Sequence, residues 1–247
     1  MTAISPSRYD EITIESADGK STTVDLRLGV ASFFYYEDLL SPTVTAKLVI
    51  VSAEGVVSNS DKTDKKESLY NGLPIRGGER VSIRIAGNSE NNAGLKFDTP
   101  ETYLYVSKVS NVIRDGQKEI FVLNLVSREA ITNELTHVTR KFSRDIPVSD
   151  NVEDILKNDL KIKPNRFKKN IDRTSNTLGF IGNLKKPFKI LVWLASKSSS
   201  TVKDSIAGYF FYQTKDGFHF RSVDELIRKG LKKPVATFTH KQYTNKL

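Results

Sequence analysis

The chain has 247 residues, of which 38% are hydrophobic and 27% are charged. This apolar content excludes a disordered chain, and the length allows one large domain or two smaller ones. The absence of Cys excludes disulfide scaffolds, thiolate metal sites and cysteine nucleophiles. The longest apolar run, Ile190 to Ala195, is far shorter than the roughly 20 residues of a membrane-spanning helix. The start of the chain also lacks an apolar signal core, so we expect a soluble protein with no membrane partner.

Charge is distributed unevenly along the chain, whose net charge is +9. Residues 1–145 hold 18 basic and 20 acidic side chains, a net charge of −2, whereas residues 146–247 hold 20 and 9, a net charge of +11. Such a basic half is typical of a protein with a charged partner or a phosphate-facing surface, although a solvated basic face is the commoner explanation.

In residues 1–145 apolar side chains recur at every second position, which predicts half-buried strands. The alternating sets are Val24, Leu26, Leu28 and Val30; Val44, Ala46, Leu48 and Ile50; and Val81, Ile83 and Ile85. The pairs Asp18-Gly19 and Asp115-Gly116 predict hairpin turns between antiparallel strands. Two polar stretches, Ser58 to Tyr70 and Gly87 to Pro100, are expected to be surface loops. Five or six such strands without a helical crossover predict a small barrel or sandwich.

A helical pattern follows from Ser127 to His137, and we predict a domain boundary near Ile146-Pro147. Beyond it, Asp150 caps a helix of about three turns, and Pro187 opens a buried helix that runs to Lys197. Tyr209 to Arg221 forms a β-hairpin turning at Asp216-Gly217, and a last helix starts after Ser222 and stops at Gly230. The predicted fold is therefore α+β and β-rich, with an antiparallel β-barrel domain in residues 1–145 and a basic, mixed helical and hairpin domain in residues 146–247.

No motif for catalysis or cofactor binding stands out. The three histidines, His137, His219 and His240, have no metal-ligand spacing. Gly72 to Gly77 has the glycine spacing of a P-loop, but Gly78-Glu79 stands where Lys and Ser or Thr should be, so we expect a turn. No serine nucleophile motif is found, and a carboxylate pair among the 29 acidic residues remains open but unsupported. We expect neither an enzyme nor a bound cofactor or metal.

The segment Lys161 to Lys186 is strongly basic, with Asp172 as its one acid and with Phe167 and Phe180 interspersed. Cations with interleaved aromatics suit phosphate contact and base stacking. The competing explanation is a solvated loop that crosses the second domain. The candidate phosphate-contact residues are Lys161, Lys163, Arg166, Lys168, Lys169, Arg173, Lys185 and Lys186.

Aromatic clusters predict self-association. Four consecutive aromatics on a strand cannot all face one core, because side chains alternate, so at least two need cover from another surface. The hairpin from Tyr209 to Arg221 also carries aromatics on both faces, and we expect it to need strand partners from outside the segment. The candidate subunit-interface residues are Phe33, Phe34, Tyr35, Tyr36, Tyr209, Phe211, Phe218 and Phe220.

Four segments resemble the baseplate hub proteins of contractile phage tails, the T4-type hub that carries the central spike. They are Phe33 to Thr45, Asn71 to Val81, Gly182 to Phe188 and Ala207 to Ile227, and together they span roughly residues 24 to 230. The resemblance implies a homotrimer whose subunits each contribute two tube-type β-barrels to a ring. That ring joins the tail tube to the spike, without catalysis, in a virion assembled in the host cytoplasm.

Only 26 residues follow Arg221, too few to complete a second tube barrel. We therefore expect either an N-terminal portion of a longer hub or a second tube domain that is reduced or completed by another polypeptide. The first hypothesis is a structural hub subunit that makes weak, non-specific DNA contact through the basic segment. The alternative is a nucleic-acid-binding β-barrel module that uses the basic half. Such a module should be monomeric and salt-sensitive, whereas a hub should assemble through apolar surface.

Overall fold

The computed structural model describes residues 8–17, 23–53, 57–58, 66–67, 73, 75–88, 94–115, 118–202 and 208–232. Contacts within the chain define two compact units. Unit 1 comprises Met1–Thr136 together with Gln213–Asp216, and unit 2 comprises His137–Tyr212 and Gly217–Leu247. The domain boundary expected near residue 146 stays a prediction.

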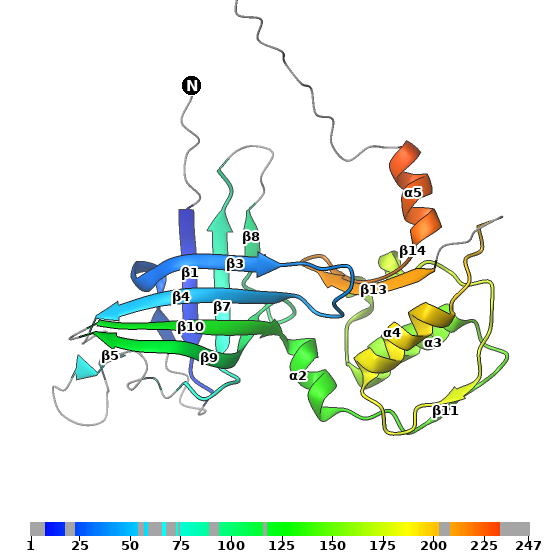
Figure 1. The fold of residues 1–247 in the computed structure, drawn as a ribbon, viewed down its shortest axis with the longest axis horizontal. Coiled ribbons are helices and arrows are strands. Elements are labelled where there is room, and N and C mark those ends of the chain that lie inside the picture. The colour runs from blue at the N-terminus through cyan, green and yellow to red at the C-terminus, as the bar shows by residue number, and fades with distance from the viewer. Residues whose placement is uncertain are drawn as a thin grey trace, which may run out of the picture. The chain divides into compact units, whose positions relative to one another are not determined.

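Unit 1 is built on one large antiparallel sheet (Figure 1). Its strand order is β2-β1-β7-β9-β10-β4-β3, with β8 paired to β7. The strands are β1 Arg8–Glu15, β2 Thr23–Asp25, β3 Val30–Tyr36, β4 Thr45–Ala53, β7 Arg80–Ala86, β8 Leu95–Phe97, β9 Leu104–Asp115 and β10 Lys118–Ser127. A separate antiparallel pair is formed by β5 Val57–Ser58 and β6 Lys66–Glu67. Among the described residues no pairing joins β2 to β3, so closure into the predicted barrel is not confirmed.

The core of unit 1 comes from strands with the predicted alternation. Leu48 and Ile50 of β4 and Val81 and Ile83 of β7 are almost completely buried. Each such side chain contributes about 1.5–3 kcal/mol when it is removed from water. The predicted antiparallel pairings of β1 with β2 and of β9 with β10 are confirmed. Residues 18–19 and 116 of the two predicted Asp-Gly turns lie outside the described residues.

Two predictions for this sheet are wrong in part. The expected strand from Val24 to Val30 breaks after Asp25, because the Asp25 carboxylate accepts the Arg27 N–H at 3.0 Å and starts a 3-10 turn, Arg27–Gly29. Leu28 is consequently fully exposed. The expected loop from residue 87 to 100 contains β8, whose Phe97 is buried opposite Ile83. Most of the other expected loop, residues 58–70, lies outside the described residues.

In the described part of the turn before β7, backbone N–H groups that could bind phosphate already donate to a carboxylate. Glu79 is buried, and its carboxylate accepts the N–H groups of Arg76 at 2.7 Å and of Gly77 at 3.0 Å. Gly77 and Gly78 both have positive φ, +109° and +90°, which residues other than glycine rarely adopt. A protein carboxylate thus occupies the backbone donors that a P-loop would offer to phosphate, which agrees with the predicted turn.

Helix α2, Arg128–Leu135, follows β10 and begins where predicted, since the Ser127 hydroxyl accepts the Ala130 N–H at 3.3 Å. In unit 2 the elements are β11 Lys141–Phe142, α3 Val148–Asp154, the π-helix η2 Ile155–Asp159, the 3-10 turns η3 Pro164–Arg166 and η4 Lys168–Asn170, β12 Phe180–Ile181, α4 Pro187–Lys197, β13 Tyr209–Thr214, β14 Gly217–Ser222 and α5 Val223–Lys232. The last two residues of β13 belong to unit 1. The helix opened by Pro187 and the hairpin of β13 and β14 are confirmed.

Two helix ends differ from prediction. Helix α3 begins at Val148, after Pro147, so Asp150 lies in its first turn and does not cap it. The π-helix η2 continues α3, and together they have the expected length of about three turns. Gly230 lies inside α5, which runs on to Lys232. A single glycine costs a helix only about 1 kcal/mol, which packing and capping of the remaining turns offset.

Candidate assembly surface

Strand β3 divides its aromatic side chains between two faces. Phe33 and Tyr35 pack against the core of unit 1, and the Tyr35 ring lies 5.0 Å from that of Phe97. Phe34 and Tyr36 point the other way and are 48% and 45% exposed. The prediction that these four rings cannot share one core is therefore confirmed, and two of them lie on the surface.

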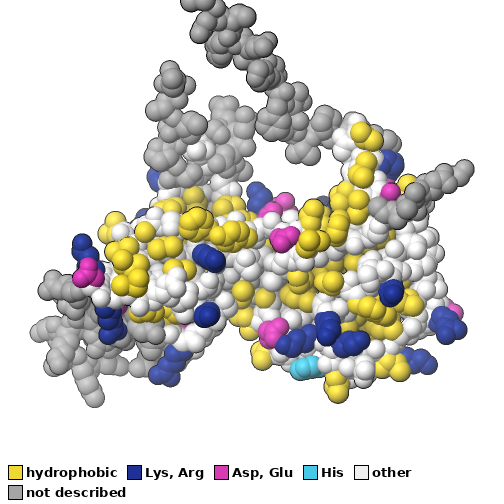
Figure 2. Space-filling view, in the orientation of Figure 1, with side chains coloured by type: hydrophobic (Ala, Val, Ile, Leu, Met, Phe, Trp, Pro, Cys, Tyr) yellow, Lys and Arg dark blue, Asp and Glu magenta, His cyan; other side chains and the backbone are white. Residues whose placement is uncertain are grey.

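Phe34 and Tyr36 pair with Lys47 and Thr45 of β4, and exposed Lys47 lies over the Tyr36 ring. Further exposed apolar side chains lie on the same side of the sheet, beginning four residues farther along β4 at Val51. Register places Val51 of β4 opposite Ile120 of β10, and Ile120 opposite Ile113 of β9. All three side chains are exposed, Ile113 by 57%. Figure 2 shows hydrophobic side chains gathered over the part of the sheet that β3 and β4 form. We call this the outer face, and it consists of Phe34, Tyr36, Val51, Ile113 and Ile120.

One end of the sheet is a candidate for pairing with another chain. Strand β3 has seven residues and pairs with β4 on one side, and no described strand pairs with its other side. Strand β2, at the opposite end, has three residues. A long edge strand with aromatic side chains offers unpaired N–H and C=O groups to a second strand. The outer face and the β3 edge therefore form one candidate assembly surface.

The four hairpin aromatics proposed as interface residues lie elsewhere. Tyr209, Phe211, Phe218 and Phe220 are buried inside the chain. The Phe188 ring of α4 lies 6.0 Å from that of Phe211 and 6.1 Å from that of Phe218, and Tyr209 lies 4.8 Å from Phe220. Helix α4 thus covers rings that the hairpin alone would expose, and these residues offer no surface to a neighbouring subunit.

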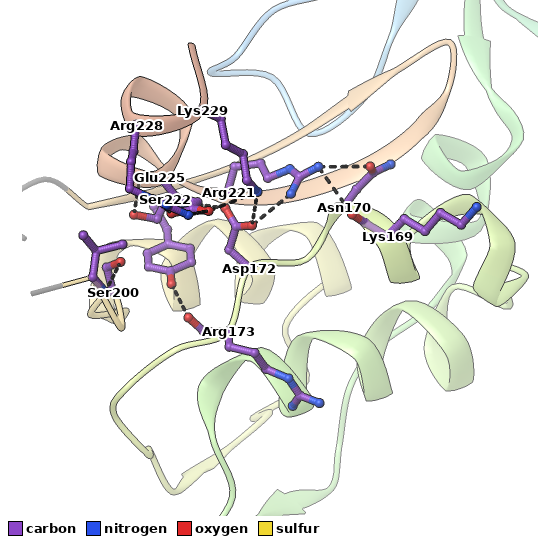
Figure 3. Close-up of polar contacts among 12 residues, drawn as sticks. Lys169, Asn170, Asp172, Arg173, Ser200, Arg221, Ser222, Glu225, Arg228 and Lys229 are labelled. Atoms are coloured by element: carbon purple, nitrogen blue, oxygen red, sulfur yellow. Dashed lines mark hydrogen bonds and ion pairs between the residues drawn. The ribbon is translucent and has the colours of Figure 1, made fainter. Parts of the chain in front are cut away.

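Beside the hairpin, Asp172 holds an irregular segment against β14 (Figure 3). Its carboxylate accepts hydrogen bonds from the Arg221 guanidinium at 2.9 Å and from the Ser222 N–H at 3.1 Å, and the Lys229 ammonium lies 3.6 Å away. Arg221 also donates to Asn170 Oδ1 at 3.2 Å. Because Asp172 and Arg221 are both largely buried, this network fixes the path of the chain between η4 and β14.

A cavity of about 440 Å³ opens next to this network, lined by Asp172, Arg173, Ser200, Thr201, Val202, Tyr209, Glu225 and Arg228. Burial, together with the charge of Asp172, raises the pKa of Tyr209 to about 12, and its hydroxyl donates to the Arg173 carbonyl at 2.6 Å. A hydrogen bond from Arg228 lowers the pKa of Glu225 to about 2. Neither group changes protonation near neutral pH, so neither has a pKa matched to general acid–base catalysis there.

The two aromatic rings interspersed in the basic segment both pack within the chain. Phe167 is buried, and the Phe180 ring stacks on that of Phe142 at 4.3 Å. Among the eight candidate cations, Arg173 pairs with Asp150, and Lys185 lies in a backbone pairing with Val138. Most of the eight are exposed, namely Lys161, Lys163, Lys168, Lys169, Arg173 and Lys185, whereas Arg166 and Lys186 are half-buried. Their contact with phosphate stays a prediction.

No group of three or more His, Asp or Glu side chains that could hold a metal ion is found in the described part of the chain. No described helix is both long and apolar enough to cross a bilayer.

The sequence indicated the exposed aromatics of β3 but not Val51, Ile113 and Ile120, because their pattern is that of ordinary alternating strand residues. Their exposure follows from the register across three strands, which only the fold provides.

Comparison with protein-family models finds no match, and neither does comparison with curated proteins. Solved structures that resemble the chain are phage tail proteins and a secretion-system component. They include a tail protein from Neisseria meningitidis (TM-score 0.46, 10% identity, covering 85% of this chain and 49% of that one) and a 43 kDa tail protein of prophage MuSo2 from Shewanella oneidensis (0.48, 12%, 85% and 54%). A third is an Escherichia coli component of the type VI secretion system, described as structurally similar to the T4 tail proteins gp27 and gp5 (0.40, 10%, 87% and 46%). The chain spans about half the length of these proteins.

Proposed function

We propose that this chain is a structural hub subunit of a contractile phage-tail baseplate, whose copies form a ring that joins the tail tube to the central spike. The observation that carries the proposal is the outer face of unit 1, where Phe34 and Tyr36 lie exposed on the edge strand β3. The second half of this strand, from Phe33 on, belongs to the stretch Phe33 to Thr45 that resembles hub proteins. A monomer would gain nothing from exposing two such rings on a strand at the edge of the described sheet.

In this proposal the sheet of unit 1 is the tube-type element of the hub. A homotrimeric ring brings the β3 edge and the outer face of each subunit against the next subunit, the tail tube or the spike. The protein then resides in the virion tail after assembly in the host cytoplasm. Its role is mechanical and needs no cofactor, and the ion pairs around Asp172 serve to hold unit 2 together.

The nucleic-acid-binding alternative is less well supported by the described residues. Base stacking needs a ring face that is open to a ligand. Phe167 is buried and Phe180 already stacks on Phe142. What remains for nucleic acid is contact between exposed lysines and phosphate, which is independent of sequence.

Light scattering on the full chain and two variants tests the proposal. Phe34→Lys places a charge on the outer face without altering the core, so we expect this variant to be mainly monomeric under conditions in which the wild type assembles. Leu28→Lys is the matched control, because Leu28 is likewise an exposed apolar residue of unit 1 but lies outside the outer face. Equal assembly of wild type and Phe34→Lys would overturn the proposed surface.

A further inference from the structure

A surface turn in unit 2 has a backbone that its sequence does not favour. In the turn Gly182–Lys185 the Lys185 N–H donates to the Gly182 carbonyl at 3.1 Å, and both central residues are left-handed, Asn183 at φ +50° and Leu184 at φ +57°. Asparagine tolerates this conformation, but leucine carries a Cβ that clashes in it. Burial of the side chain does not offset this backbone strain, because Leu184 is 66% exposed.

The fold holds this turn firmly in place. The Leu184 N–H donates to the Val138 carbonyl at 3.0 Å, and the Val138 N–H donates to the Lys185 carbonyl at 3.0 Å. A Cβ on Gly182 would overlap the same Val138 carbonyl, so only glycine fits there. An exposed leucine is therefore kept in an unfavourable conformation by its surroundings, which is typical of a position selected for contact.

The neighbourhood of the turn is apolar and basic. Ile181, just before it, is 63% exposed. Lys185 and Lys189 are exposed, and neither forms an ion pair with another described residue. Figure 2 shows Lys and Arg side chains lying among hydrophobic ones over unit 2. We call Ile181, Leu184, Lys185 and Lys189 the basic knob.

Unit 1 carries a loop with the opposite charge and the same apolar character. In Glu37–Leu40, which we call the acidic loop, Leu39 and Leu40 are both exposed, Leu40 by 76%. The Asp38 carboxylate accepts the Leu40 N–H at 2.8 Å, and Glu37 accepts the Lys215 N–H at 2.6 Å. The loop is thus preorganised and presents two carboxylates with two leucines.

We propose that the basic knob of one copy of this chain docks on the acidic loop of a second copy. Leu39 and Leu40 of the acidic loop would cover Leu184 and Ile181. Lys185 and Lys189 would then lie near the Glu37 and Asp38 carboxylates. A second copy is the partner that the charges favour, because the basic knob carries Lys185 and Lys189 and the acidic loop carries Glu37 and Asp38. The two surfaces differ, so the contact is head-to-tail and repeats from copy to copy, which closes a ring when the rotation permits. This inference deepens the proposed function, on which it rests for self-association.

Disulfide cross-linking tests the contact directly, because the native chain has no Cys. Full-length Leu184→Cys is mixed with full-length Leu40→Cys under mild oxidation, and the linked heterodimer is measured on a non-reducing gel. A disulfide forms only when the two Cα atoms come within about 7 Å. We expect the heterodimer in several-fold excess over the control mixture of Leu184→Cys with Leu28→Cys. Equal yields in the two mixtures would overturn the docking.

Two further changes test the contact: one reverses the charge of the basic knob, and the other removes the backbone strain at Leu184. Adding Lys185→Glu and Lys189→Glu to the Leu184→Cys chain should lower the cross-linked yield about tenfold, because like charges then face each other. Leu184→Asn should keep or raise the melting temperature, because asparagine tolerates the left-handed region, yet it should weaken assembly. Unchanged yield after charge reversal would overturn the inference. If no cross-link forms although the wild type still assembles, the docking contact is wrong but the hub proposal stands. Failure of the inference and failure of the proposed function are therefore distinguishable.

Discussion

The Asp172 carboxylate and the Arg221 guanidinium lie 2.9 Å apart, and both side chains are largely buried in unit 2. Asp172 also accepts the Ser222 N–H, so it ties the segment after η4 to the end of β14 and the start of α5. This pairing gives the basic segment one fixed point, although the rest of that segment has little regular structure.

Removing Asp172 should destabilise unit 2. Asp172→Ala leaves the Arg221 charge without its carboxylate, and we expect a loss of about 2–3 kcal/mol in the free energy of unfolding. Denaturant unfolding followed by circular dichroism measures this change. Asp216→Ala, at the exposed hairpin turn, is the control and should lie within about 0.5 kcal/mol of wild type. A similar effect for both variants would contradict the structural role of the pair.

Gly217 should not tolerate any side chain. Its φ is +133°, and an added Cβ would overlap the Arg166 carbonyl, so Gly217→Ala should destabilise unit 2 by about 2 kcal/mol or more. Gly230→Ala is the matched control, because its Cβ would meet open space within α5, and it should stabilise the chain by up to about 1 kcal/mol. Thermal unfolding of both variants checks the opposite signs. Equal shifts in melting temperature would refute the account of Gly217.

Tyr209 should contribute to alkaline unfolding. Burial raises its pKa to about 12, so the folded state resists ionisation more strongly than the unfolded state does. The resulting stability is fully present below the ordinary pKa near 10 and is lost as pH rises toward 12. Tyr209→Phe should flatten the fall in stability across this window, although it also loses the hydrogen bond to the Arg173 carbonyl. Unfolding curves at several alkaline pH values decide this, and an identical slope in both proteins would count against it.

DNA contact by the basic segment should be weak and independent of sequence. Exposed Lys168 and Lys169 can neutralise phosphates, whereas Phe167 is buried and the Phe180 ring already stacks on that of Phe142. Fluorescence anisotropy with two unrelated duplexes should give equal affinities that fall with salt, with a logarithmic slope of about −0.9 per phosphate contacted. A strong preference for one duplex would instead favour a sequence-reading module.

The sequence predicted the elements whose apolar period is undisturbed. Alternation located β4 and β7, and the Ser222 cap located α5, because both signals are local and agree with the tertiary packing. The errors occur where a side chain redirects the backbone. Asp25 bonds to the Arg27 N–H and breaks an otherwise alternating strand, and Phe97 forms β8 within a polar stretch because it pairs with Ile83.

The candidate assembly surface was only partly predictable. The four adjacent aromatics of β3 indicated exposure by alternation alone, and the structure confirms it for Phe34 and Tyr36. The hairpin aromatics were predicted as interface residues because they occupy both faces of a two-stranded ribbon, and nothing in the sequence shows that Phe188 of α4 packs against them. Leu184 carried no signal, since its left-handed backbone depends on pairing with Val138 across more than forty residues.

Native mass spectrometry of the full wild-type chain tests the central claim most directly, because it counts subunits. A ring-forming hub subunit should appear as a trimer that persists at moderate salt, since apolar contacts are screened far less than ionic ones. A chain that remains monomeric at every concentration and salt level tested would contradict the assignment of the outer face to self-assembly and, with it, the proposed function.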